Sequence, residues 1–378
     1  MDSFLAFQST RKFRATRNKK EVHGNRHYEQ SNQSGCDLQV RLHSVKHLIP
    51  HGLSSAAPKI TNNNIIPLQG PANNHVESTN KSDVPTKTFE EVTFPMTYGN
   101  VAAKIWGPSN GKPVFALHGW LDNAGTFDNL IPMLPDNLRV VAVDIPGHGL
   151  SDHFPRDIMY HFMDCLLAIE RISQQLKWDT FSFIGHSLGG CMAMLYAGVF
   201  PEKVVKLVNV DIVRVTTTRA ETMNLRLRKT VGKLLKYENA IMQGPEKPIT
   251  YETAIEKSIN GSFGSLNRKA CEVMLKRGLK KVNGGYVFSR DRRLHAAPLS
   301  FCPKQDQVIL AEKVTADVLI IKFIEGPYFE SIEDQIEHIE ALKKNSKSVR
   351  YVEIEGKHHT HLTHPERIAS LISEFFKS

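Results

Sequence analysis

One stretch of the chain combines the signals of a strand, a tight turn and a helix. It runs from Thr180 to Ala193 and reads TFSFIGHSLGGCMA. An apolar run comes first, then a G-x-S-x-G motif centred on Ser187, then small residues that suit a helix. In this motif the serine stands on a sharp strand-to-helix turn, and the flanking glycines leave space where a Cβ atom would collide. The stretch therefore predicts a nucleophile elbow, with Ser187 as the attacking group.

Apolar runs and segments of helical period alternate on both sides of this stretch. The runs predict strands over residues 89–96, 101–106, 113–117, 139–145, 204–210, 317–323 and 349–354. Helical spacing of apolar residues predicts helices over residues 127–134, 158–176, 332–344 and 365–376. Strands that alternate with helices form parallel sheets with right-handed crossovers. We therefore expect an α/β fold with a mostly parallel sheet that is covered on both faces.

The alternation of strands and helices stops after Asp211 and resumes near residue 314. The segment between these points reads as mostly helical with glycine-rich breaks, which indicates an inserted cap over residues 214–313. The core would then consist of residues 86–213 and 314–378. Residues 1–85 are rich in polar and basic side chains with few regularly spaced apolar ones, so we expect a disordered basic extension there.

The charge distribution bears on possible partners. The formal net charge is +9, which invites a comparison with nucleic-acid-binding proteins. Residues 1–85 carry 11 basic and 6 acidic side chains and residues 214–313 carry 20 and 9, so the rest of the chain is net negative. No nucleic-acid-binding module is recognisable, and we expect no nucleic-acid partner. No run approaches the roughly 18 apolar residues of a membrane span, so no integral membrane segment is expected. The sequence leaves the oligomeric state open.

Cysteine usage and the N-terminus bear on the compartment. Five cysteines are scattered without the spacing of a metal site, which suits free thiols in a reducing compartment. The N-terminus lacks the apolar core of a secretory signal. We therefore expect an intracellular protein, cytoplasmic in the first place. The basic cluster at residues 11–20 keeps a mitochondrial address open as an alternative. No metal or cofactor is implied.

The general base is sought after the last predicted strand. A serine hydroxyl needs a histidine within hydrogen-bond reach, and four histidines stand there: His358, His359, His361 and His364. At the level of motifs the chain resembles the α/β-hydrolase superfamily, in which the catalytic histidine is followed by a second histidine after three residues and a proline after seven. His358 fits this pattern, and we identify it as the base.

The acid that would orient the base is less clear from the sequence. In related hydrolases it often stands in the loop after the strand at 317–323, but that loop contains no aspartate before Asp334. Asp211, at the end of the strand before the cap, occupies a position that carries the acid in some relatives. Asp211 is therefore our first candidate, Glu330 the main alternative, and Glu325 or Asp334 the remaining ones.

The oxyanion hole is expected to use two backbone N–H groups. One belongs to Leu188, directly after the nucleophile, and the other to Trp120, in the loop after the strand at 113–117. Two such donors, with Ser187 and His358, would complete the groups needed for acyl transfer.

Four segments resemble the serine hydrolase-like (kraken-like) family of α/β hydrolases, and they lie at residues 117–135, 141–153, 183–193 and 352–362. The resemblance spans about residues 86–377. It implies the α/β-hydrolase fold and a serine hydrolase of poorly defined substrate, associated with the cytoplasm, peroxisomes or detoxification. A serine in the elbow suits hydrolysis of a carboxylic ester, or a related acyl bond, of a small or lipophilic substrate. The alternatives are an acyl-CoA thioesterase and a receptor-like ligand-binding protein with a vestigial triad.

Overall fold

The computed structural model describes residues 66–67, 87–217, 220–296 and 302–378. Nearly all of the predicted N-terminal extension lies outside these residues, so its expected disorder stays a prediction. Within the described ranges, no helix combines the length and the apolar character that crossing a membrane would need.

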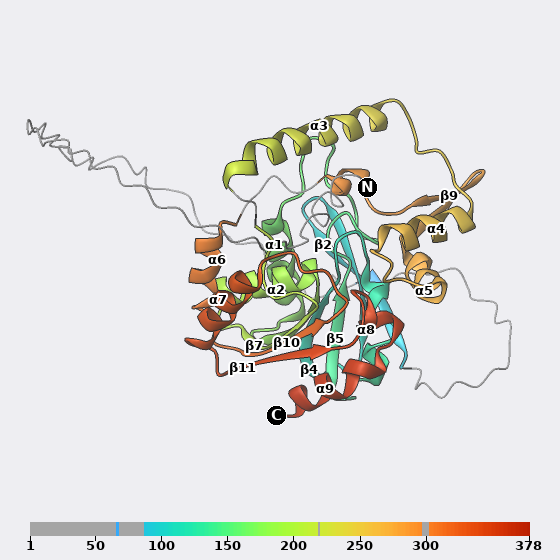
Figure 1. Ribbon diagram of the computed structural model, residues 1–378. Coiled ribbons are helices and arrows are strands. Elements are labelled where there is room, and N and C mark those ends of the chain that lie inside the picture. The colour runs from blue at the N-terminus through green and yellow to red at the C-terminus, as the bar shows by residue number, and fades with distance from the viewer. Residues whose placement is uncertain (1–65, 68–86, 218–219, 297–301) are drawn as a thin grey trace, which may run out of the picture. The chain divides into compact units, whose positions relative to one another are not determined.

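A nine-stranded sheet lies at the centre of the described chain (Figure 1). Its strands follow the order β1-β2-β3-β5-β4-β6-β7-β10-β11. Neighbours are antiparallel from β1 to β5 and parallel from β5 to β11, which confirms the predicted mostly parallel sheet. The strands are β1 (Ile66–Pro67), β2 (Phe89–Met96), β3 (Gly99–Trp106), β4 (Lys112–Leu117), β5 (Leu138–Val143), β6 (Phe181–His186), β7 (Val204–Val210), β10 (Asp317–Phe323) and β11 (Ser348–Ile354).

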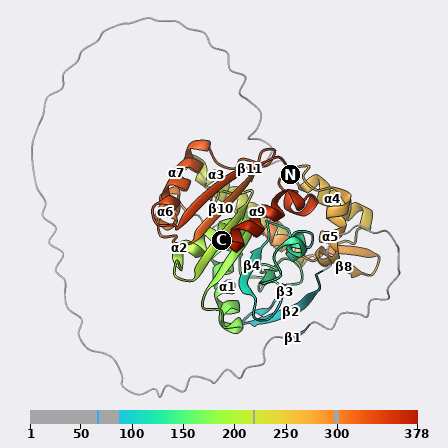
Figure 2. The same cartoon turned by 90° about the horizontal axis from the view of Figure 1, so that it is seen from below.

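Both faces of the sheet are covered, because successive strand side chains point to opposite sides. One face packs against α1 (Phe162–Leu176), α2 (Leu188–Val199) and α7 (Ile332–Lys343) in a single apolar cluster. The other packs against α9 (Glu366–Lys377) and the residues before β5. Figure 2 shows α9 and the C-terminus near the middle of the view from below. The two clusters account for the continuous apolar character of the parallel strands.

The prediction of a helix over residues 127–134 is wrong. The structure has two short 3₁₀ turns in its place, Ala124–Phe127 and Ile131–Met133. Pro132 has no N–H to donate to the carbonyl four residues earlier, so an α-helix cannot run through this segment without losing a hydrogen bond. The apolar side chains of the segment are still buried beneath the sheet, which explains why its spacing resembled that of a helix.

Helix α1 begins at Phe162 rather than at residue 158. His161 has extended backbone angles, and its N–H donates to the Asp164 carboxylate three residues later. An acidic side chain at this position satisfies one of the donors that a helix start leaves unpaired. The cap therefore fixes the start of the helix, and the apolar residues before it belong to the preceding loop.

The segment between β7 and β10 is mainly helical, and it also contains a two-stranded hairpin. Figure 1 shows α3, α4 and β9 beyond one end of the sheet. Helix α6, in contrast, packs against α2 and α7 beside the sheet. The elements are a 3₁₀ turn at Ala220–Thr222, α3 (Met223–Met242), α4 (Tyr251–Gly261), α5 (Arg268–Gly278), β8 (Leu279–Val282), β9 (Gly285–Phe288), a 3₁₀ turn at Arg292–His295 and α6 (Lys304–Ala311).

A buried arginine joins α5 to the core. Arg277 lies between Glu91 of β2 and Asp144, which follows β5, and its closest nitrogens are 2.5 and 2.6 Å from their carboxylate oxygens. Asp144 also accepts the backbone N–H groups of Ala124 and Leu150, so this carboxylate fixes the turn after β5. One charge cluster therefore holds the turn and α5 together.

Candidate active site

The predicted elbow is present between β6 and α2. Ser187 has φ 51° and ψ −116°, a left-handed conformation that is strained for a residue with a side chain. A Cβ atom on Gly185 would lie 2.5 Å from Cα of Gly190, and one on Gly189 would lie 2.0 Å from the carbonyl oxygen of Leu117. The two glycines of the motif are therefore required by close backbone approach.

Gly189→Ala tests this requirement. The added methyl group must push α2 away from β4, and we expect the free energy of unfolding to fall by about 3 kcal/mol, as for an overpacked core. Gly232→Ala is the matched control, because a Cβ atom there meets nothing within 4 Å in helix α3. Urea denaturation measures both variants. Equal stability of the two variants would contradict the packing argument.

His358 lies close to the elbow. It follows β11 and is buried, and its Nδ1 is 2.6 Å from Oδ2 of Asp211. Its backbone carbonyl accepts a hydrogen bond from Nε2 of His186 at 2.9 Å, and the two rings lie 4.6 Å apart. Because His186 directly precedes Ser187, this contact fixes the loop that carries His358 against the elbow.

The protonation of His358 follows from its surroundings. Asp211 accepts the Nδ1 proton, which leaves Nε2 as the nitrogen that can take up a proton. Burial lowers the pKa of His358 to about 4, although the hydrogen bond with Asp211 opposes this shift. The imidazole is therefore neutral near pH 7. Among the described residues, neither Nε2 of His358 nor the Ser187 hydroxyl makes a hydrogen bond, so the two are not bonded to each other.

Of the four candidate acids, Asp211 is the one that contacts His358. It is fully buried at the end of β7, with a left-handed φ of 55°. Its second oxygen, Oδ1, accepts hydrogen bonds from Nζ of Lys322 at 2.6 Å and from the N–H of Phe323 at 2.9 Å. A Cβ atom on Gly326 would lie 2.2 Å from Oδ2, so the loop after β10 closes over the carboxylate.

The other candidate acids have different partners. The Glu330 carboxylate accepts the N–H and hydroxyl of Thr217 at 2.5 and 3.0 Å. Asp334 lies in α7 and pairs with Lys304, and Glu325 is exposed at the surface. None of the three is paired with His358.

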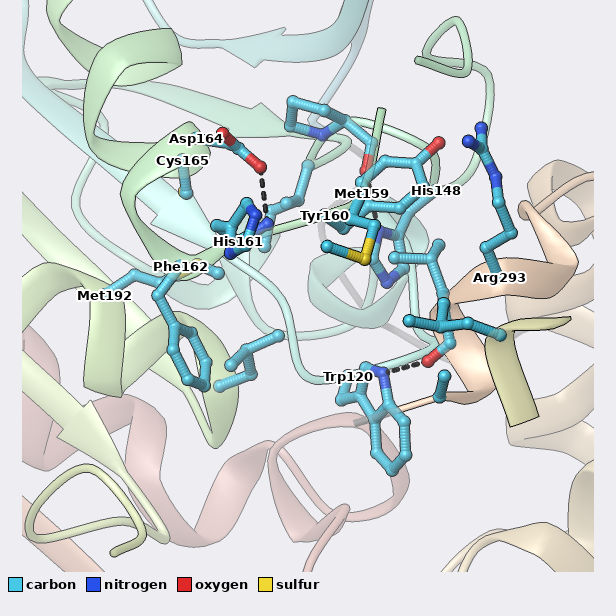
Figure 3. A pocket seen from close by; sticks show the side chains of 16 residues that line it. Trp120, His148, Met159, Tyr160, His161, Phe162, Asp164, Cys165, Met192 and Arg293 are labelled. Carbon is cyan, nitrogen blue, oxygen red and sulfur yellow. Dashed lines mark hydrogen bonds between the residues drawn. The ribbon is translucent and has the colours of Figure 1, made fainter. Parts of the chain in front are cut away.

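Trp120 and Leu188, the candidate oxyanion donors, both line one pocket (Figure 3). Leu188 is the first residue of α2, where N–H groups lack acceptors within the helix. The indole Nε1 of Trp120 donates to the carbonyl oxygen of Leu294 at 2.8 Å. This bond ties the loop after β4 to the segment between β7 and β10. The use of both backbone N–H groups by a substrate stays a prediction. The rest of the wall is mainly apolar, with the polar residues His148, His161, Asp164 and Arg293 beside Ile145, Pro146, Met159, Tyr160, Phe162, Cys165, Met192, Leu234, Leu294 and Ala296.

The sheet order and the elbow define the class of protein, an α/β hydrolase. Residues 112–268 match the family model described as alpha/beta hydrolase fold. The solved structure of the hypothetical protein PA1622 from Pseudomonas aeruginosa PAO1 is 30% identical in sequence. The alignment covers 76% of this chain and 99% of that one, with a TM-score of 0.67.

Two curated relatives narrow the class. The chain is 35% identical to a probable serine hydrolase of Drosophila melanogaster, over 77% of this chain and 88% of the relative. It is 34% identical to serine hydrolase-like protein 2 of Homo sapiens, over 76% of this chain and 94% of the relative. The chain belongs to the serine hydrolase-like family.

Sequence reasoning missed two features of the site. Lys322, which pairs with Asp211, was read as part of an apolar strand, although a lone lysine in the run DVLIIKF signals a buried partner. The second feature is a cluster of Asp122, His186 and His359 beside the elbow. Its members come from the loop after β4, the end of β6 and the segment after β11, so no local pattern joins them.

Proposed function

We propose that the chain is a serine hydrolase that cleaves a carboxylic ester of a small or lipophilic acyl substrate through an acyl-enzyme intermediate. The observation that carries the proposal is the pair formed by His358 and the buried Asp211 at 2.6 Å, on a loop held against the residue before Ser187. The serine hydrolase-like names of the relatives agree with it.

The proposed reaction has two halves. Oγ of Ser187 attacks the carbonyl carbon while Nε2 of His358 takes the hydroxyl proton, and the tetrahedral intermediate collapses as that proton passes to the leaving alkoxide. Asp211 keeps the Nδ1–H of His358 in place and stabilises the imidazolium. Water then repeats the sequence on the acyl-enzyme. The two N–H groups of Trp120 and Leu188 would each stabilise the oxyanion by about 3 kcal/mol.

The pocket suggests the kind of substrate. Its walls combine the oxyanion candidates with apolar side chains from α1, α2 and the inserted segment. An acyl chain can bury apolar surface there, at about 25 cal/mol for each Å² removed from water. The polar lining residues are His148, His161, Asp164 and Arg293, and the apolar ones outnumber them, which favours a lipophilic acyl chain.

Ser187→Ala tests the proposal on the full chain. We expect the wild type to release a burst of p-nitrophenol from p-nitrophenyl acyl esters and to react covalently with a fluorophosphonate probe. The variant should lose the labelling and at least about 10⁴-fold in kcat, because the nucleophile is gone.

Ser370→Ala, an exposed site in α9, is the matched control and should label like the wild type. A folded wild type that neither labels nor turns over any ester would support a ligand-binding protein instead. Turnover confined to acyl-CoA substrates would reassign the bond to a thioester.

A further inference from the structure

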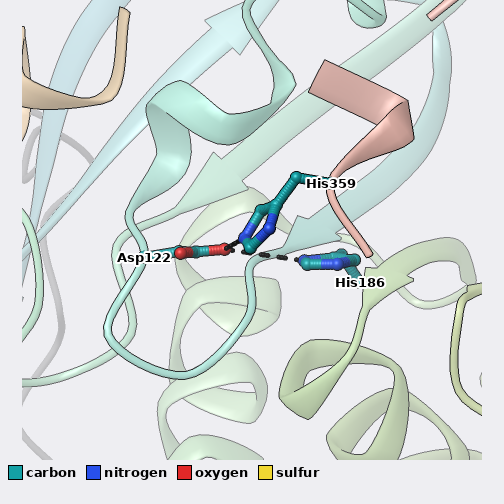
Figure 4. Close-up of side chains that lie close together, drawn as sticks. All are labelled: Asp122, His186 and His359. Atoms are coloured by element: carbon teal, nitrogen blue, oxygen red, sulfur yellow. Dashed lines mark hydrogen bonds and ion pairs between the residues drawn. The ribbon is translucent and has the colours of Figure 1, made fainter. Parts of the chain in front are cut away.

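A second cluster of polar side chains lies beside the proposed catalytic groups and takes no part in the proposed reaction. Asp122, His186 and His359 are all buried, and Figure 4 shows the Asp122 carboxylate facing both imidazole rings. Asp122 follows Trp120 by two residues, His186 directly precedes Ser187, and His359 directly follows His358. The cluster therefore joins the loop after β4, the end of β6 and the segment after β11, and each of them lies beside a group of the proposed site.

The contacts of His359 accommodate a neutral ring with its proton on Nδ1. Its Nδ1 lies 2.6 Å from the hydroxyl oxygen of Ser265, and this hydroxyl donates its single proton to the carbonyl of Ser262. A hydroxyl that makes this donation accepts from Nδ1–H of His359. In the neutral ring Nε2 then carries a lone pair, and it faces Oδ2 of Asp122 at 3.3 Å.

His186 is arranged in the same way. Its Nε2 lies 2.9 Å from the carbonyl oxygen of His358, which can only accept, so Nε2 carries the proton. The other nitrogen, Nδ1, lies 3.6 Å from the same Oδ2 of Asp122. It is buried and has no hydrogen-bond partner within the described part of the chain. In this protonation state two nitrogen lone pairs and a carboxylate oxygen converge, whereas a proton on Nε2 of His359 would instead be donated to Asp122 at the same 3.3 Å.

We propose that this cluster binds a divalent first-row transition-metal ion, Zn²⁺ by the nature of its donors. Nδ1 of His186, Nε2 of His359 and Oδ2 of Asp122 would be the three protein ligands. In a tetrahedral site with bonds of about 2.0–2.1 Å, ligand atoms lie about 3.3–3.5 Å apart. The separation of 3.3 Å falls in this range, the separation of 3.6 Å is slightly longer, and all three ligand atoms lie within 4.8 Å of one another.

The outer contacts of the two histidines match those of metal ligands. A ligating histidine usually donates its other N–H to an oxygen that fixes the ring, and here the acceptors are the Ser265 hydroxyl and the His358 carbonyl. A bound ion would tie the loops of Trp120, Ser187 and His358 to one point. Its role would be to stabilise the arrangement of the site.

The test uses the full chain, stripped with a chelator and then titrated with Zn²⁺ or Co²⁺. We expect one tightly bound ion per chain by elemental analysis. We also expect a rise in Tm of about 5 °C when free Zn²⁺ is a hundredfold above Kd. Co²⁺ should give visible d–d absorption without thiolate charge-transfer bands, which separates this site from binding by cysteine.

Variants assign the ion to the cluster. His359→Gln and Asp122→Asn should each abolish the bound equivalent and the Tm rise, whereas His364→Gln, at an exposed position five residues after His359, should keep both. The proposal is overturned if the wild type binds no more metal than His359→Gln, in which case the cluster holds a proton. If both ligand variants fail to fold, the wild-type cobalt spectrum decides: absence of d–d bands at one equivalent of Co²⁺ overturns the site.

Discussion

Asp211→Asn should lower kcat for p-nitrophenyl acyl esters by about 10⁴-fold, the size of the effect of such a change in a serine protease triad. The asparagine side chain can present an N–H to Nδ1 of His358, which places the ring proton on Nε2. The imidazole then cannot accept the proton of Ser187. Steady-state kinetics, normalised to the fraction of folded protein, measures the loss.

Glu330→Gln is the matched control for the choice of acid. Its carboxylate is bound to Thr217, so we expect kcat to stay within about threefold of the wild type. The reverse pattern, with full activity in Asp211→Asn and a large loss in Glu330→Gln, would transfer the role of the acid to Glu330. It would also require the loop after β10 to rearrange during turnover.

Lys322→Met should lower the free energy of unfolding by about 3–5 kcal/mol. Lys322 and Asp211 are both almost fully buried, with side-chain exposures of 2% and 0%. Removing one partner of a buried ion pair leaves the other charge without compensation. Chemical denaturation monitored by tryptophan fluorescence measures the change.

Two comparisons isolate this effect. Lys203→Met removes a lysine that pairs with Glu170 in a partly exposed position, and we expect a cost of at most about 1 kcal/mol. In the Asp211→Asn background the Lys322→Met change should cost much less than in the wild type, because the buried charge is gone. Additive effects of the two substitutions would show that the ion pair does not couple them.

Local patterns predicted much of the fold and part of the site. The run from Phe181 to Ile184 became β6, and the motif after it became the elbow at Ser187. The strand and the elbow both depend on residues that are neighbours along the chain, so a single sequence is enough to predict them. The segment with Pro132 shows where apolar spacing fails to predict a helix. Its spacing is helical, but Pro132 lacks the N–H that an α-helix needs there, and a 3₁₀ turn forms instead.

The sequence made Asp211 the first candidate for the partner of His358, but it did not exclude Glu330. Asp211 and His358 are 147 positions apart, and they meet because β7, β10 and β11 are neighbours in the sheet. The sequence predicted a mostly parallel sheet, but not which strands would be adjacent. Glu330 accepts the N–H of Thr217 instead, a contact that joins two segments 113 positions apart and that no local pattern predicts.

The anchoring of Arg277 has a consequence for engineering acyl-chain preference. Helix α5 cannot shift without separating Arg277 from two carboxylates, so substitutions there would disturb the sheet as well. Helix α3 has only Thr230 and Leu234 buried among its residues, and Leu234 also faces the pocket. Libraries that reshape the pocket wall are therefore best placed on α3, where side-chain size can vary while the charged anchor stays intact.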